Sequence, residues 1–153
     1  MNLKVGNKFP DFKLSDDNGE IFQLYKDSKS SFLVLYFYPK DETPGCTKQA
    51  CHFKEYYDDF NQLDCEIIGI SSDDEKSHKK FKNKYNLPFK LLCDRHSRLR
   101  KEIKLPKDFF GLSPGRVTFL LSSVNEILFI HKSSLKMKSH IKEVLEFLNK
   151  NIL

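Results

Sequence analysis

The segment YPKDETPGCTKQAC, residues 38–51, follows an apolar run and contains two cysteines five positions apart. Pro39 ends the apolar run, Thr43 or a neighbour caps the helix that follows, and Pro44 suits an early helical position. Cys46 therefore falls in the first turn of that helix. There its sulfur meets unpaired backbone N–H groups and the positive end of the helix dipole, which both favour a thiolate over a thiol. We expect Cys46 to be a reactive nucleophile.

The second cysteine, Cys51, has different surroundings on the same helix. The residues three and four positions away from it are all polar: Thr47, Lys48, Lys54 and Glu55. Cys51 is therefore expected on the polar side of the helix, away from the stripe that contains Cys46. Because a free cysteine is usually among the most buried residues, this position indicates chemical use.

An intact helix keeps the two thiols apart. Five residues correspond to a rise of about 7.5 Å and place the Cα atoms of Cys46 and Cys51 roughly 8.6 Å apart. A disulfide needs a Cα separation below about 7 Å. Bond formation therefore requires the first turns of the helix to unwind, and Gly45 lowers the cost of such an opening.

Length and composition limit the setting in which these thiols act. The chain of 153 residues fits one domain, residues 1–153, and needs no disulfide staples. The N-terminal sequence MNLKVGNKFPDF has charges and a proline where a signal peptide needs an apolar core, and no stretch approaches a membrane span. We expect a soluble, cytoplasmic protein, in which a disulfide is transient and catalytic.

The net charge of +5 is spread thinly along the chain, which argues against a nucleic-acid patch. Its densest part, KSHKKFKNKY at residues 76–85, has the pattern of a helix with one buried edge and a solvated basic face. We therefore expect no binding to nucleic acid or to a membrane.

The elements that hold the cysteine segment read as a β-α-β unit. The runs at residues 31–38 and 65–72 are apolar and rich in β-formers, as in strands that are covered on both faces. Between them, residues 46–62 have apolar side chains at helical spacing. The two strands should therefore be parallel and neighbours in one sheet.

The rest of the chain continues the alternation of helix and strand. We expect helices at residues 75–86, 95–103 and 137–152, a short strand at 89–93, and an antiparallel hairpin of strands at 117–123 and 126–132. The apolar stripe of the last helix consists of Met137, Ile141, Val144, Leu145, Leu148 and Ile152. A mixed sheet with helices on both faces, an α/β fold, is the simplest arrangement of these elements.

The cysteine segment also resembles a known family. Pro39, Thr43 and Cys46 match the peroxiredoxin pattern PxxxTxxC, and the longer string FYPKDETPGCTKQAC is similar to the peroxiredoxin Q, or bacterioferritin comigratory protein, subgroup. Three further segments resemble the family: VGNKFPDFKLSDDNGE upstream, and IIGISSDD and LPKDFFGLSPGRVTFLL downstream. The resemblance implies a thioredoxin-like fold, with a central mixed sheet flanked by helices and an N-terminal β-hairpin extension.

The resemblance further implies a thiol peroxidase and assigns a role to each matching residue. Cys46 would be the peroxidatic cysteine, which attacks a hydroperoxide and becomes a sulfenic acid. Thr43 would hydrogen-bond the thiolate and the peroxide, Arg116 would keep the thiolate charged and stabilise the leaving oxygen, and Pro39 would shield the pocket from water. Cys51 would be the resolving cysteine.

The remaining expectations concern partners. The resemblance implies hydrogen peroxide and organic hydroperoxides as substrates, an intramolecular disulfide that thioredoxin or a similar dithiol reduces, and no cofactor or metal. Because that disulfide forms within one subunit, we expect a monomer. Two rival functions stay open: a disulfide exchanger or redox sensor of the thioredoxin superfamily, which usually has C-x-x-C rather than C-x-x-x-x-C, and a non-enzymatic holding chaperone.

The other candidate residues are interpreted from their places in the predicted elements. Arg116 directly precedes a strand, where a fixed cation is useful beside a thiolate. Cys65 and Cys93 adjoin apolar strands and are expected to be buried structural thiols. His52 does not share a helix face with both Cys46 and Cys51, so we expect no zinc site there. Solvated or partly packed roles are expected for the other histidines: His78, His96, His131 and His140.

Overall fold

The computed structural model describes residues 1–108, 113–133 and 136–152, without the side chains of residues 108, 113, 114 and 152. Its main feature is a seven-stranded mixed sheet in the order β2-β1-β5-β4-β3-β8-β9. These strands are β1 (Lys13–Asp16), β2 (Ile21–Gln23), β3 (Phe32–Phe37), β4 (Cys65–Ser71), β5 (Lys90–Cys93), β8 (Val117–Ser122) and β9 (Ile127–Lys132). A separate antiparallel ribbon consists of β6 (Lys107–Asp108) and β7 (Ser113–Pro114).

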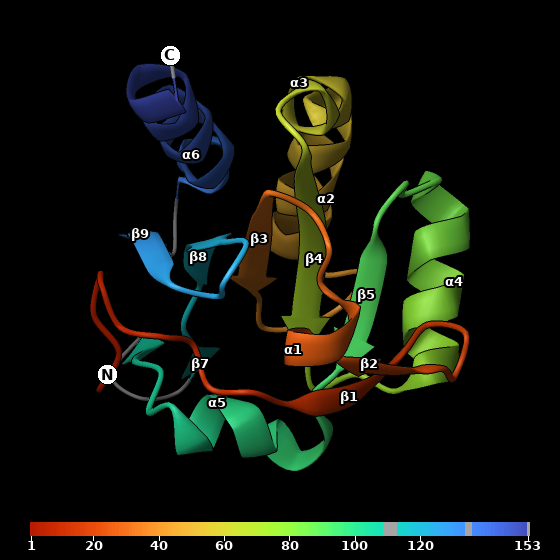
Figure 1. The fold of residues 1–153 in the computed structure, drawn as a ribbon. Helices are drawn as coiled ribbons and strands as arrows, with labels where there is room; N and C mark the ends of the chain where they lie inside the picture. The colour runs from red at the N-terminus through yellow and green to blue at the C-terminus, as the bar shows by residue number, and fades with distance from the viewer. Residues whose placement is uncertain (109–112, 134–135, 153) are drawn as a thin grey trace.

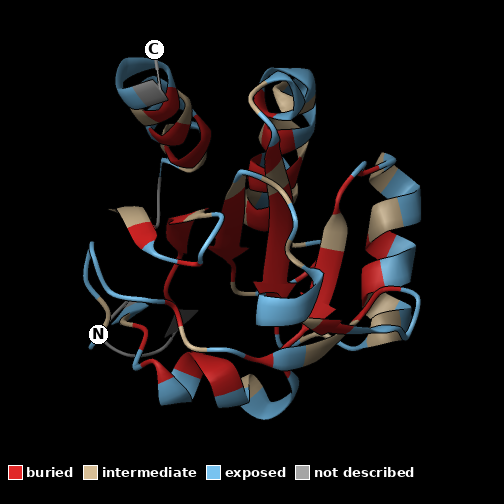
Figure 2. Cartoon of the chain, in the orientation of Figure 1, coloured by how far each residue is buried: buried red, intermediate tan, exposed pale blue. Residues whose placement is uncertain are grey.

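Three neighbouring strands form the parallel centre of the sheet. β3 pairs with β4, and β4 pairs with β5, in parallel register (Figure 1). β8 joins the other side of β3 in antiparallel register, so the sheet is mixed as expected. Apart from one partly buried residue in each, these central strands are buried (Figure 2), which explains why their sequences are largely apolar runs.

Helices cover both faces of this sheet. They are α1 (Leu24–Asp27), α2 (Pro44–Glu55), α3 (Tyr57–Gln62), α4 (Glu75–Tyr85), the 3-10 turn η1 (Arg95–Ser97), α5 (Arg98–Glu102) and α6 (Met137–Ile152). Side chains of β3 alternate between two cores: Leu33 and Leu35 pack in the one beneath α1 and α5, whereas Val34 and Tyr36 pack in the one beneath α2, α3, α4 and α6. The expected three-layer α/β architecture, with a thioredoxin-like fold, is confirmed.

The helix between β3 and β4 differs from the expected single helix. Tyr56 has φ −100° and ψ 13°, so the helical backbone is interrupted there and the segment forms α2 and α3. Most of the expected apolar positions are still buried, among them Phe53 and Phe60, whereas Tyr57 is only partly buried. The periodicity of the apolar side chains therefore predicted the buried face but not the break.

The two hairpins of the sheet form as expected. β1 and β2 pair in antiparallel register, and β1 also pairs with β5, so the N-terminal hairpin extends the main sheet. The turn between β8 and β9 lacks an Asn-Gly pair, but Asn125 adopts a left-handed φ of 64°. The hydroxyl of Ser122 accepts hydrogen bonds from the backbone N–H groups of Val124 and Glu126. This hydroxyl stabilises a turn that its sequence signals only weakly.

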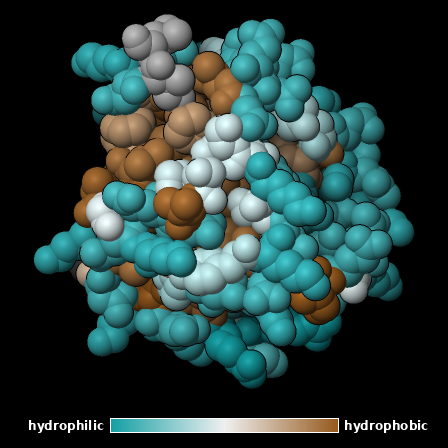
Figure 3. All heavy atoms as spheres, viewed as in Figure 1, coloured by the Kyte–Doolittle hydropathy of each residue, from teal (hydrophilic) through white to brown (hydrophobic). Residues whose placement is uncertain are grey.

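The last helix packs as its stripe predicted. Ile141, Val144 and Leu148 are fully buried, and the side chain of Ile152 lies outside the described residues. Phe147 of α6 also contacts Phe129 of β9, with ring centroids 5.0 Å apart. In Figure 3, hydrophobic atoms gather beside α6, while most of the rest of that face is hydrophilic. Among the described helices, none has the length and apolar character of a membrane span.

Candidate active site

Cys46 lies in the first turn of α2, which begins at Pro44. Its side chain is 1% exposed, and its sulfur accepts two hydrogen bonds from the surrounding structure. Arg116 Nη1 donates to Cys46 Sγ over 3.1 Å, and the backbone N–H of Lys40 lies 3.5 Å from the same sulfur. A cation, a backbone donor and the helix N-terminus therefore converge on one atom, and each of them favours the thiolate.

Arg116 directly precedes β8 and is 8% exposed, so it is a buried arginine and not a surface residue. Its guanidinium lies against Gly45, the residue before the cysteine. A Cβ atom on Gly45 would lie 2.8 Å from Arg116 Nη2 and 3.1 Å from Cε of Met137. A side chain at this position would therefore have to displace the guanidinium or the methionine, a role of Gly45 that the sequence analysis did not foresee.

Gln49 is a site residue that the sequence analysis missed. Its side chain is fully buried, and its Oε1 accepts a hydrogen bond of 2.9 Å from Arg116 Nη1. Its amide nitrogen has no hydrogen-bond partner among the described residues. The spacing could have revealed it, because a residue three positions after Cys46 shares its helix face. Gln49 fixes the direction of the guanidinium toward the sulfur.

Arg100 is a second buried arginine that sequence reasoning did not single out. Its guanidinium donates to the backbone oxygen of Gly115 over 2.7 Å and to that of Tyr38 over 3.3 Å. Gly115 precedes Arg116, and Tyr38 precedes Pro39, so Arg100 joins the two chain segments that meet at the cysteine. No pattern in the sequence indicates this pairing, which depends on the packing of α5 beneath the sheet.

Thr43 and Pro39 lie in the turn that precedes α2. Thr43 occupies the N-cap position, as expected, but its side chain makes no capping bond. Its hydroxyl instead donates to the backbone oxygen of Lys40 over 2.9 Å and so closes the turn on itself. Pro39 follows the buried Tyr38 and is partly exposed. The structure therefore places both residues beside Cys46 in the chain, with the threonine hydroxyl engaged by Lys40.

Cys51 is half-buried and lies on the same unbroken helix as Cys46. All four cysteines are free thiols in this structure. Helical geometry places the Cα atoms of Cys46 and Cys51 roughly 8.6 Å apart, beyond the reach of a disulfide. The structure therefore represents the reduced protein, in which α2 is intact.

The other two cysteines are buried, as expected. Cys65 is 4% exposed and Cys93 is 2% exposed. Burial raises the pKa of the Cys65 thiol to about 12, and its sulfur donates to the backbone oxygen of Glu66. A thiol of this kind stays protonated near neutral pH and is inert.

The expectation for the histidines is wrong in two cases. His78 and His140 are fully buried, because each finds hydrogen-bond partners for both ring nitrogens within the fold. His140 Nδ1 lies 2.8 Å from the hydroxyl of Thr118, and its Nε2 lies 2.7 Å from the backbone oxygen of Ser133. Burial lowers the pKa of His140 to about 4, which makes it a neutral ring at physiological pH.

Comparisons with known proteins identify relatives over most of this chain. The model of the AhpC/TSA family matches residues 5–130. The chloroplastic peroxiredoxin Q of Arabidopsis thaliana is 47% identical over 146 residues, which cover 95% of this chain and 67% of that protein. The chloroplastic peroxiredoxin Q of Oryza sativa subsp. japonica is 46% identical over the same shares.

Solved structures show the same relationship. The peroxidoxin BcpB of Mycobacterium tuberculosis superposes with a TM-score of 0.89 at 28% identity, over 98% of this chain and 99% of that one. The bacterioferritin comigratory protein of Xanthomonas campestris, described for its alkyl peroxide reduction activity, superposes with a TM-score of 0.82 at 31% identity. That match covers 93% of this chain and 92% of the other.

Proposed function

The chain belongs to the AhpC/TSA family and is a peroxiredoxin of the peroxiredoxin Q subgroup, a thiol-dependent peroxidase, and from this premise we propose that Cys46 is its peroxidatic cysteine. The observation that carries this assignment is the distance of 3.1 Å between Arg116 Nη1 and Cys46 Sγ. A permanently charged guanidinium at this distance stabilises a thiolate inside a site that is almost closed to water. Cys65 and Cys93, the other buried thiols, have no such contact with a guanidinium among the described residues.

In the first step, the Cys46 thiolate attacks one oxygen of the hydroperoxide. A sulfur–oxygen bond forms, the oxygen–oxygen bond breaks, and the leaving oxygen departs as water or as an alcohol after it takes up a proton. Arg116 and the Lys40 N–H stay near the developing negative charge, which is where fixed donors contribute most to the rate. Thr43 and Pro39 bound the approach of the peroxide from the turn before α2.

In the second step, Cys51 resolves the sulfenic acid. Its sulfur attacks the sulfur of Cys46, an S–S bond forms, and the hydroxyl group leaves as water. Because α2 holds the two residues too far apart, its first turns must unwind before this bond can form. The resulting disulfide accepts two electrons from an external dithiol, for which we propose thioredoxin or a protein of similar chemistry.

Substrates, assembly and location are the finer parts of the proposal. The alkyl peroxide activity described for the Xanthomonas campestris protein supports organic hydroperoxides as substrates in addition to hydrogen peroxide. A monomer is sufficient, since both cysteines belong to one helix. A cytoplasmic location stays a prediction, and the plant relatives carry chloroplastic names.

The rival functions of the sequence analysis receive little support from the site. A disulfide exchanger must present its attacking sulfur to a disulfide on another protein, whereas Cys46 is 1% exposed. A holding chaperone has no need of a guanidinium directed at a thiol. A small hydroperoxide fits the enclosed sulfur better than either alternative.

A thioredoxin-coupled assay that follows NADPH consumption with hydrogen peroxide tests the two cysteine roles. Cys46→Ser should abolish turnover, because no other described thiol has the same surroundings. Cys51→Ser should lose turnover with thioredoxin but keep turnover with a small dithiol, which can reduce the sulfenic acid directly. Full activity of Cys46→Ser would refute the assignment of the nucleophile, and full thioredoxin-dependent activity of Cys51→Ser would refute the resolving role alone.

Hydrogen exchange tests the proposed unwinding of α2. Oxidation to the disulfide should reduce the protection of the backbone amides at residues 46–52, while the amides of α4 keep theirs. Equal protection of residues 46–52 in the two redox states would contradict the unwinding and leave the peroxidatic role of Cys46 intact.

A further inference from the structure

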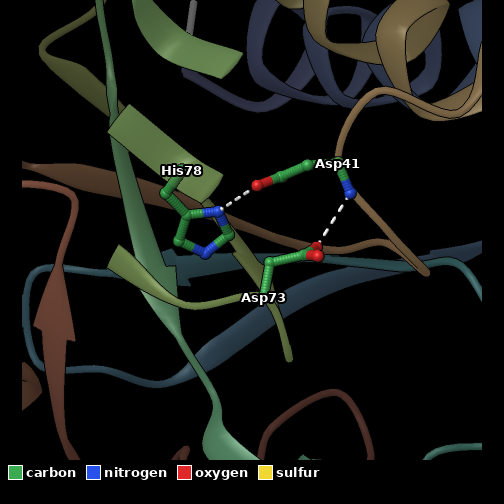
Figure 4. A group of neighbouring side chains, drawn as sticks. All are labelled: Asp41, Asp73 and His78. Carbon is green, nitrogen blue, oxygen red and sulfur yellow. Dashed lines mark hydrogen bonds and ion pairs between the residues drawn. The ribbon is translucent and has the colours of Figure 1, made fainter. Parts of the chain in front are cut away.

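His78 of α4 is a buried histidine whose two ring nitrogens both face oxygen atoms. Its Nδ1 lies 2.7 Å from Asp41 Oδ2, and its Nε2 lies 2.8 Å from the backbone oxygen of Leu92. Figure 4 shows the ring directed at the Asp41 carboxylate, while the carboxylate of Asp73 points toward the backbone nitrogen of Asp41. A backbone oxygen only accepts hydrogen bonds, so Nε2 must carry a proton.

The surroundings of Asp41 show that Nδ1 is protonated as well. The carboxylate of Asp41 is almost completely buried and accepts hydrogen bonds from the hydroxyl of Tyr38 over 2.6 Å and from that of Ser77 over 2.9 Å. Two hydroxyls already direct their protons at this carboxylate, so the third contact, at 2.7 Å, is a hydrogen bond that His78 Nδ1 donates. His78 is therefore an imidazolium ion paired with Asp41.

The direction in which the fold shifts the pKa of His78 agrees with this geometry. Burial by itself would lower the pKa of His78, but the Asp41 carboxylate and the Cys93 sulfur outweigh it and raise the pKa to about 10. His140, which is equally buried but faces no carboxylate, shifts in the opposite direction. Burial therefore decides the neutral state of His140, whereas the charged partner decides the state of His78.

The same atoms could be mistaken for a metal site. Ligand atoms of Asp41, Asp73 and His78 lie within 4.8 Å of one another. A metal needs a free lone pair on the imidazole, however, and both nitrogens of His78 carry protons. Asp73 Oδ2 already accepts hydrogen bonds from the backbone N–H of Asp41 and from the hydroxyl of Ser71. The cluster is therefore saturated by its own hydrogen bonds.

The ion pair is connected to the reactive sulfur through one short loop. Asp41 follows Lys40, whose N–H is one of the two donors to Cys46 Sγ and whose carbonyl oxygen accepts from Thr43. The side chain of Asp41 is held by His78 and its backbone N–H by Asp73, so this residue is anchored to both α4 and the end of β4. Because Asp41 and Lys40 are adjacent in the chain, a displacement of the Asp41 backbone would also displace the Lys40 N–H from the sulfur.

We propose that His78 is a positioning residue of the peroxidase: as a buried imidazolium paired with Asp41, it holds the loop at residues 39–43 so that the Lys40 N–H reaches the Cys46 sulfur. The inference rests on the proposed role of Cys46 as the nucleophile. His78 itself touches neither the sulfur nor the peroxide. It acts through a loop that is also held by the Asp73 contact, the turn of Thr43 and the ion pair of Lys84 with Glu42.

The protonation state can be tested in the unmodified reduced protein. Nitrogen-15 NMR of the imidazole rings distinguishes a doubly protonated ring from either neutral tautomer. We expect His78 to give the imidazolium signature at pH 8, where an ordinary histidine is neutral, and His140 to give a neutral signature at the same pH. A neutral His78 at pH 8 would overturn the proposal without any variant.

The positioning role needs a second measurement, the pH profile of Cys46 alkylation by iodoacetamide in a Cys51→Ser background. We expect His78→Gln and Asp41→Asn each to move the midpoint of this profile to higher pH and to slow the reaction with hydrogen peroxide about 10-fold. The double variant should be no worse than either single variant, because both changes release the same loop.

A stability control separates positioning from general damage. Ile127→Ala, in the core on the opposite face of the sheet, should lower the melting temperature but leave the midpoint unchanged. If His78→Gln does not fold, Tyr38→Phe removes only one donor to Asp41 and should give a smaller shift in the same direction. An unchanged midpoint in the folded variants would overturn the proposal, whereas the assignment of Cys46 would fall only with an active Cys46→Ser.

Discussion

Cys46 and Cys65 are two thiols of nearly equal exposure, 1% and 4%, that differ in what surrounds the sulfur. Cys46 receives a guanidinium at 3.1 Å and a backbone N–H at 3.5 Å. Cys65 donates its own proton to a backbone oxygen and has a backbone hydrogen bond with Val34 but, among the described residues, no cation beside it, and burial raises its pKa to about 12. Burial without a cation keeps the Cys65 thiol protonated, whereas the sulfur of Cys46 lies beside a permanently charged guanidinium.

The difference arises from position in the fold. Cys65 begins β4, in the middle of the sheet, where neighbouring strands offer apolar side chains and paired backbone groups. Cys46 lies in the first turn of α2, and Arg116 directly precedes β8. The start of a helix and the start of a strand therefore meet at this sulfur. The ends of elements have unpaired donors, and Gly45 leaves room for the guanidinium to use the same space. Four predictions test this comparison.

The largest effect is expected from removal of the cation. Arg116→Ala should make the surroundings of Cys46 resemble those of Cys65 and slow its reaction with hydrogen peroxide by about 10²–10³-fold, measured by stopped-flow fluorescence or a competition assay. Arg95→Ala is the matched control, because Arg95 is exposed and pairs with Glu75. A loss of less than about 5-fold in Arg116→Ala would mean that the helix N-terminus alone activates the thiol.

A smaller effect is expected from crowding the cation without removing it. Gly45→Ala places a Cβ atom 2.8 Å from Arg116 Nη2, so the guanidinium must shift, and the peroxide reaction should slow about 10-fold. Alanine favours a helix by about 1 kcal/mol over glycine, so the melting temperature should not fall for reasons of propensity. Full activity in Gly45→Ala would show that the position of the guanidinium tolerates such a shift.

The raised pKa of the Cys65 thiol predicts how the free energy of unfolding changes with pH in alkaline solution. The pKa of Cys65 is raised in the folded protein, so above the ordinary thiol pKa near 9 the unfolded chain releases a proton that the folded protein keeps. This difference should lower the free energy of unfolding by about 1.4 kcal/mol per pH unit as the pH rises toward 12. In urea titrations between pH 8 and 10.5 the wild type should lose stability faster than Cys65→Ala as pH rises, and parallel curves would contradict the buried state.

The smallest effect is expected from Cys65→Ser on catalysis. The serine hydroxyl can donate to the Glu66 oxygen as the thiol does, and the site contains no contact to this residue. Turnover with hydrogen peroxide should stay within about 2-fold of the wild type. A loss of turnover comparable to that of Cys51→Ser would assign Cys65 a redox role and end the contrast between the two thiols.

The sequence predicted the parts of this molecule that repeat along the chain. The strands β3 and β4 are continuous apolar runs, and the helices α2 and α6 have apolar side chains at helical spacing. Such local patterns predict the type and the buried face of an element, and they also located the hairpins. The place of Cys46 in the first helical turn was also visible, because Pro44 and the apolar spacing fix the start of α2. Its pairing with Arg116, 70 residues away, came from the family resemblance and Arg116's place before a strand.

The polar contacts around the site could not be predicted in the same way. Gln49, Arg100 and the pair of Asp41 and His78 each depend on single hydrogen bonds between elements distant in the chain. Such contacts leave no periodic trace, and a buried histidine has the same letter as a solvated one. The break at Tyr56 was missed because the apolar side chains on either side of it face the same core.

The most direct test of the account traps the first product in a protein that still contains both kinds of buried thiol. The Cys51→Ser variant, treated at pH 7 with one equivalent of hydrogen peroxide and then with dimedone, reports by peptide mass spectrometry which sulfur became a sulfenic acid. The account predicts the adduct on Cys46 and none on Cys65 or Cys93. An adduct on Cys65 at a comparable yield, or none on Cys46, would contradict it.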